Sequence, residues 1–174
     1  MRTTMYSVEI DIRQDELLAE IAGRLKLTAD SAGSNADLHN TTDVLDDGNR
    51  EIVTGLIARY MYEVMNILHP FAKMPVRRMR RGRDGDDEAE MYGILLVFER
   101  ERSETQIQQL ERLVKDYIVY RCFAEWTEMT MPGTNTYTMW EQKAEETREQ
   151  IAACLVLPYS PKRLRVRPHW YCDD

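Results

Sequence analysis

The chain has 174 residues, of which 43% are hydrophobic and 30% are charged, the size and composition of about one globular domain. Its formal net charge of -7 excludes a surface that attracts nucleic acid as a whole, so contact with DNA or RNA would need a local basic patch. The sequence contains no run of about 18 apolar residues, and we expect no transmembrane helix.

The first part of the chain predicts one strand followed by two helices. Apolar residues alternate with polar ones over residues 6–12, which indicates a strand with one buried face. A helix is expected over 14–27, and a longer one over 48–69, where an apolar stripe recurs at helical spacing. Residues 28–47 are small and polar, and they predict either a mobile loop or a loop that contains a short helix.

Two further strands are expected near 74–81 and 91–99. The polar, glycine-containing connection at 82–90 predicts a β-hairpin with a long tip, poorly ordered in the free protein. The second strand is apolar on both faces, which is typical of a central strand or of one covered on both sides.

The rest of the chain predicts a pair of long helices. Ser103 and Gln106 form a capping box at the start of the first, which runs to about residue 131. Pro132-Gly133 then breaks it, and a last helix is expected over about 135–157, with Thr134 or Asn135 as its N-cap. A connection this short predicts that the two helices pack antiparallel.

These elements together predict a mostly helical α+β fold. It has four helices, including the long C-terminal antiparallel helix hairpin. A small antiparallel sheet combines the N-terminal strand with the protruding β-hairpin, and an extended C-terminal arm follows the last helix. We expect one compact domain over residues 1–158 and the arm over 159–174.

The helix over about 104–131 is apolar on two sides, so we expect it to be buried on two sides. One of these sides carries Val119, Phe123 and Trp126. In one interpretation, this side meets a second copy of the chain as an oligomer interface. In the other, the sheet and the remaining helices of the same chain cover both sides.

The residues that could carry chemistry do not form a known catalytic motif. The sequence lacks a Walker loop, a dinucleotide-binding fingerprint and a nucleophile elbow. The three histidines and three cysteines are scattered, without metal-ligand spacing. Asp43, Asp46 and Asp47 are interpreted as helix-capping residues rather than a cation site. We therefore expect no catalytic residue, no metal and no cofactor, and synthesis in a reducing cytoplasm.

A run of arginines precedes the hairpin tip, and acidic residues follow it over 84–90. Arginine side chains match phosphate oxygens, so this run is a candidate for binding DNA or another partner. The alternative is a solvated hairpin whose opposite charges face each other across the strands. The candidate residues are Arg77, Arg78, Arg80, Arg81 and Arg83.

The C-terminal arm alternates basic and apolar residues and ends in aromatics. Prolines on both sides keep it from being helical, and the alternation favours a strand that adds to the sheet edge of a partner. The alternatives are an arm folded back on its own domain and a disordered tail. The candidate partner-binding residues are Leu164, Val166, Trp170 and Tyr171.

Most of the chain resembles small virion proteins of tailed phages and prophages, and most closely the head–tail connector, or neck, proteins. The resemblance covers about residues 48–170 as a pattern of elements, from which the strand at 6–12 departs. It is carried by the helix with Tyr117, Val119, Tyr120 and Trp126, the break at Pro132-Gly133, the helix with Tyr137 and Trp140, and the basic and aromatic arm.

This resemblance implies a non-enzymatic structural protein that assembles as a homo-oligomeric ring between portal and tail. Its partners would be further copies and other virion proteins, and its final location the virion. The alternative is a nucleic-acid-binding accessory protein that uses Arg77–Arg83. A third possibility is an enzyme whose site is built from scattered residues.

Overall fold

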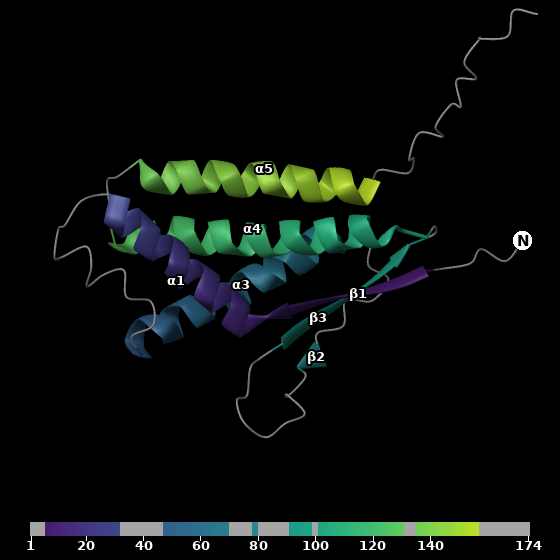
Figure 1. The fold of residues 1–174 in the computed structure, drawn as a ribbon, viewed down its shortest axis with the longest axis horizontal. Helices are drawn as coiled ribbons and strands as arrows, with labels where there is room; N and C mark the ends of the chain where they lie inside the picture. The colour runs from purple at the N-terminus through teal and green to yellow at the C-terminus, as the bar shows by residue number, and fades with distance from the viewer. Residues whose placement is uncertain are drawn as a thin grey trace, which may run out of the picture.

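The computed structural model of the protein describes residues 6–31, 47–69, 78–79, 91–98, 101–130 and 135–156. The predicted hairpin tip at 82–90 and the arm at 159–174 lie outside these residues, as does most of the polar segment 28–47. The elements that follow keep the numbering of Figure 1.

The alternating N-terminal segment forms strand β1, Tyr6–Arg13, as predicted. It pairs antiparallel with β3, Met91–Phe98, which in turn pairs antiparallel with the short β2, Arg78–Met79. The strand order is β1-β3-β2, so β3 is the central strand. The face of β3 that carries Tyr92, Ile94, Leu96 and Phe98 is buried, whereas Met91, Leu95 and Val97 on the other face are only partly buried.

Helix α1, Gln14–Ser31, follows β1 directly. Its predicted end was residue 27, and the helix continues for four more residues. Helix α3, Asp47–Leu68, carries the predicted apolar stripe, whose members Val53, Ile57 and Val64 are fully buried.

The capping box predicted at the start of helix α4, Glu104–Thr130, is present. The Gln106 amide donates to the Ser103 Oγ over 3.3 Å, and the Ser103 amide donates to the Gln106 Oε1 over 3.1 Å. These bonds satisfy two donors that a helix start otherwise leaves without partners. Helix α5, Thr136–Val156, begins after Asn135, whose carbonyl accepts the Met139 amide.

Helix α4 lies between two layers of the molecule. Figure 1 shows α5 running antiparallel along one side of α4, with α1, α3 and the sheet on the other side. The predicted helix hairpin and the mostly helical α+β class are therefore confirmed. Among the described residues, none of the helices is both long and apolar enough to cross a membrane.

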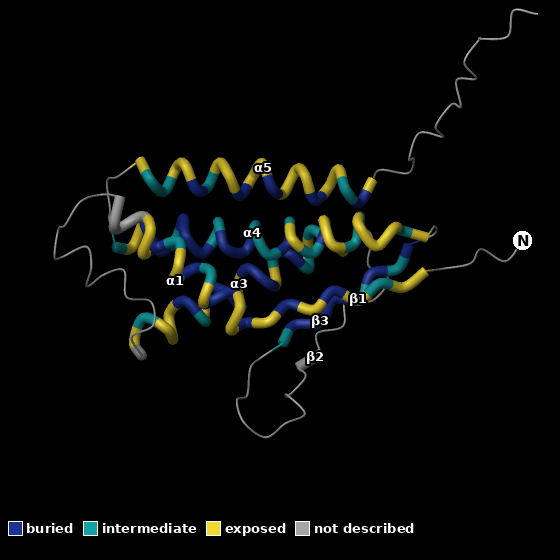
Figure 2. The backbone as a smooth tube through the Cα atoms, viewed as in Figure 1, coloured by how far each residue is buried: buried dark blue, intermediate teal, exposed yellow. Residues whose placement is uncertain are grey.

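Both apolar sides of α4 are buried within one chain. Val119 and Phe123 have no exposed surface, and Trp126 is 3% exposed. Figure 2 shows burial along most of α4, whereas α5 keeps an exposed face. Of the two arrangements considered for this helix, the structure has the one in which elements of the same chain cover both sides.

Candidate functional site

The predicted partner-binding residues lie mostly outside the described part of the chain. Arg78 is in β2, in register with Gly93 of β3, and the other predicted positions are not described. Those predictions therefore stay open for Arg77, Arg80, Arg81, Arg83, Leu164, Val166, Trp170 and Tyr171.

The predicted oligomer interface, by contrast, is fully described. Phe123 packs on the Trp140 ring with centroids 4.7 Å apart, and Tyr120 stacks on the same ring with centroids 5.7 Å apart. The Lys143 ammonium lies 4.3 Å from the Trp140 ring centroid. Because Val119 and Phe123 have no exposed surface and Trp126 is 3% exposed, these residues offer almost no area to a second chain.

A connected group of polar residues surrounds Arg121 on α4, and we call it the Arg121 cluster. Arg121 forms an ion pair with Glu141 of α5, and its Nε lies 3.7 Å from the Glu63 Oε2 of α3. The Tyr117 hydroxyl donates to Glu63 over 2.7 Å. Arg121 also lies over the Tyr60 ring, 4.9 Å from its centroid. One guanidinium thus joins three helices.

A third carboxylate, beside this cluster, joins α3 and α4. Glu125 accepts a hydrogen bond from the Tyr60 hydroxyl and another, over 2.7 Å, from Arg59 Nη1. A cavity of about 340 Å³ opens here. Its lining combines charges of both signs with a methionine and aromatic rings, from Arg59, Tyr60, Arg121, Glu125, Glu128, Met129, Tyr137 and Glu141.

The two buried tyrosines of this region are held in their neutral form. Burial raises the pKa of Tyr60 well above its ordinary value, and its hydrogen bond to Glu125 raises the pKa further. The pKa of Tyr117 is raised in the same way, by burial and by its hydrogen bond to Glu63. A neutral phenol can donate a hydrogen bond to a carboxylate. Here the two tyrosine–glutamate hydrogen bonds link α3 to α4.

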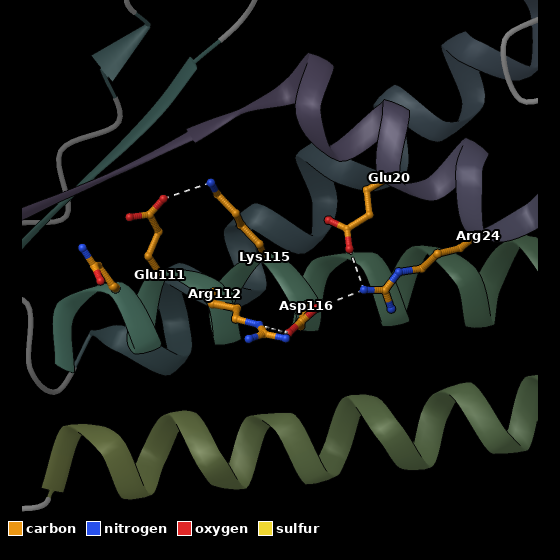
Figure 3. Close-up of a pocket in the computed structure, with 7 residues that line it drawn as sticks. Glu20, Arg24, Glu111, Arg112, Lys115 and Asp116 are labelled. Carbon is orange, nitrogen blue, oxygen red and sulfur yellow. Dashed lines mark hydrogen bonds and ion pairs between the residues drawn. The ribbon is translucent and has the colours of Figure 1, made fainter. Parts of the chain in front are cut away.

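A second charged cluster lies where α1 crosses α4, beside a cavity of about 390 Å³ (Figure 3). Arg24 Nη2 donates to Glu20 over 2.5 Å and to Asp116 over 3.2 Å. Lys115 pairs with Glu111 at 2.9 Å, as Figure 3 shows, and with Glu16 of α1 at 3.3 Å. Charges of opposite sign are paired throughout, and the pairs fix α1 on α4.

The described thiols are poor nucleophiles. Burial raises the pKa of Cys122, which lies in the core as predicted, and burial also raises the pKa of the half-buried Cys154. A thiol with a raised pKa forms little of the reactive thiolate at neutral pH. Within the described ranges, no three His, Cys, Asp or Glu residues are grouped so that they could hold a metal ion.

The outer edge of β1 is the third polar feature. In the part of the chain that the structure describes, β1 has one strand neighbour, β3. Ile10 and Ile12 point to the core, whereas Ser7, Glu9 and Asp11 on the other face are exposed. An edge strand presents unpaired backbone donors and acceptors, to which a further strand can add.

The sequence interpretation missed both charged clusters. Their members are ordinary surface residue types, and their partners lie far apart in the chain: 54 residues for Tyr117 and Glu63, and 92 residues for Arg24 and Asp116. Spacing within one helix could have indicated only the local pairs, such as Glu20 with Arg24 and Glu111 with Lys115.

Comparisons of the chain with protein-family models, with curated proteins and with solved structures found no match.

Proposed function

We propose that the protein is a non-enzymatic structural component of a tailed phage or prophage particle, of the head–tail connector type, and that it assembles as a homo-oligomeric ring. The observation that carries this proposal is the α4–α5 hairpin, Glu104–Thr130 and Thr136–Val156, on which the resemblance to connector proteins rests. The hairpin lies on a sheet whose edge strand β1 is unpaired on its outer side among the described residues.

The charged clusters support a structural role. In the Arg121 cluster and at the crossing of α1 and α4, the carboxylates are neutralised by arginine or lysine, or accept hydrogen bonds from tyrosine. Pairs of this kind that join different helices fix the relative positions of those helices. Helices fixed in this way, with a strand edge that is unpaired among the described residues, suit a subunit that is built into a larger assembly.

Electron micrographs of the purified full-length chain test this proposal. We expect closed rings with one dominant subunit number. Particles without rotational symmetry at all protein concentrations would contradict the proposal.

A DNA-binding titration on the same preparation distinguishes the structural role from the alternative, a nucleic-acid-binding role. Binding that weakens steeply with salt, and that is lost when the arginines of 77–83 are replaced by alanine, would favour the nucleic-acid-binding role instead.

A further inference from the structure

We propose that the C-terminal arm of one copy adds as a fourth strand to the outer edge of β1 on a second copy, with its arginines on the acidic face of that strand. This inference rests on the proposed homo-oligomer and names the surface through which neighbouring copies join. The occupant is the segment 162–167, which Pro161 and Pro168 bound.

The alternation of β1 matches the alternation of the arm. Successive side chains of a strand point to opposite faces. On β1, Glu9 and Asp11 share the exposed face, and Ile10 and Ile12 share the buried one. In the arm, arginines and apolar residues alternate in the same period of two.

A strand formed by the arm can therefore match both faces of β1 in only one of its two possible orientations. Arg163, Arg165 and Arg167 then share one face, and Leu164 and Val166 share the other. With the arginines beside the acidic side chains of β1, the apolar pair continues the buried face. A slip of one residue would put the arginines on the core side, so the register is strongly specified.

The charge of the β1 face is suited to this partner. The next residue on that face, Arg13, already pairs with Asp15 at 2.7 Å. Glu9 and Asp11 thus remain as the acidic groups of this face, opposite the three arginines of the arm. Opposite charges on neighbouring strands stabilise the pairing, and like charges oppose it.

The position of the end of α5, from which the arm begins, favours docking of the arm on a second copy rather than on its own chain. Arg102 donates to the Leu155 carbonyl at 2.9 Å and lies over the Phe98 ring, and Phe98 pairs with Tyr6. Helix α5 thus ends near the Tyr6 end of the sheet. Figure 1 shows that α5 runs toward that end, opposite to the direction of β1.

To reach its own β1 edge, the arm would have to reverse its direction between α5 and residue 162. Leu157 and Ser160 each precede a proline, and residues before proline are disfavoured in the helical region that tight turns use. The prolines themselves have a fixed φ. In the proposed arrangement, an extended segment after α5 would lead beyond the chain's own sheet and toward a neighbouring copy.

A charge-exchange experiment on the full-length chain tests the inference. The first variant reverses the edge, with Glu9→Arg and Asp11→Arg, and the second reverses the arm, with Arg163→Glu and Arg165→Glu. We expect each variant alone to associate roughly tenfold more weakly or worse than the wild type, because like charges then face each other across the strands. An equimolar mixture should recover the assembly, because each arm then meets an edge of opposite charge. Sedimentation velocity measures all three samples.

Two controls separate the pairing from other effects. The double variant Glu51→Arg with Glu149→Arg makes the same change of net charge as the edge variant, but at exposed sites on α3 and α5. It should assemble like the wild type. Glu9→Gln with Asp11→Asn removes the attraction without creating repulsion, and it should give an intermediate loss. Denaturation midpoints close to that of the wild type establish that each variant is folded.

The outcomes distinguish this inference from the proposed function. If the wild type assembles and either reversed variant assembles equally well, the arm does not dock on β1, while the oligomer stands. The same conclusion holds if both variants dissociate but their mixture does not recover. If the wild type is a monomer at all concentrations, the proposed assembly fails, and this inference fails with it.

Discussion

Trp126 and Trp140 lie on the two helices of the hairpin, and both are largely buried, at 3% and 8% exposure. Neither indole nitrogen has a hydrogen-bond acceptor among the described residues, so the contribution of these rings comes from packing. We expect Trp126→Ala and Trp140→Ala each to lower the free energy of unfolding by about 3–5 kcal/mol. Chemical denaturation measures the change, and Met129→Ala, at an exposed site on α4, should leave the midpoint nearly unchanged. Midpoints equal to that of the wild type for the tryptophan variants would contradict the packing described for these rings.

Tyr60 and Tyr117 should make the stability of the fold depend on pH in the alkaline range. Their pKa values are raised in the folded protein, whereas an unfolded tyrosine titrates near about pH 10. Above that pH the unfolded chain binds fewer protons than the folded one, so stability falls as pH rises. The stabilisation is fully present below about pH 10 and is lost as pH approaches the folded pKa.

Thermal melts between neutral pH and about pH 11 measure this loss. The double variant Tyr60→Phe with Tyr117→Phe should be less stable at neutral pH but flatter in its alkaline dependence. The matched control is Tyr62→Phe, at a residue that is 54% exposed, and it should keep the wild-type slope. An unchanged slope in the double variant would show that other groups cause the alkaline loss.

At the scale of elements, the start of α4 depends on its capping box. Ser103→Ala removes the acceptor of the Gln106 amide, and we expect a loss of about 1 kcal/mol of stability. The neighbouring Thr105→Ala, at an exposed site within the helix, should change stability by less than about 0.5 kcal/mol. Equal effects of the two substitutions in denaturant titrations would mean that the cap contributes nothing specific.

The sequence predicted most elements because their signals are local. Alternation located β1, helical periodicity located α3, and the Ser103–Gln106 pair located the start of α4. The end of α1 was predicted four residues early because Leu27 is the last large apolar residue of the segment. Leu27 is itself 70% exposed, so the periodic signal had already faded where the helix continues.

What covers α4 could not be read from its own residues. Its two apolar sides required two neighbours, but the pattern is the same whether a neighbour is α5 or another chain. The Arg121 cluster was hidden for a similar reason, since Glu63, Arg121 and Glu141 come from three helices. Only the tertiary arrangement brings them together.

At the scale of the whole molecule, we propose that the core and the arm separate along the chain. Among the described residues, the last member of the buried core is Leu155. A chain that ends after Pro158 should therefore keep a denaturation midpoint close to that of the full-length protein but lose its assembly. Thermal melting and sedimentation of the truncated chain measure the two properties. Unfolding would assign the arm to the chain's own core, and unchanged assembly would mean that the arm does not join the copies.

The most direct measurement of the central claim is the mass of the full-length chain in solution as a function of its concentration. Sedimentation equilibrium gives this mass without assumptions about shape. A homo-oligomeric structural subunit predicts one discrete multiple of the monomer mass, with dissociation only on dilution. A monomer mass at every concentration would contradict the account.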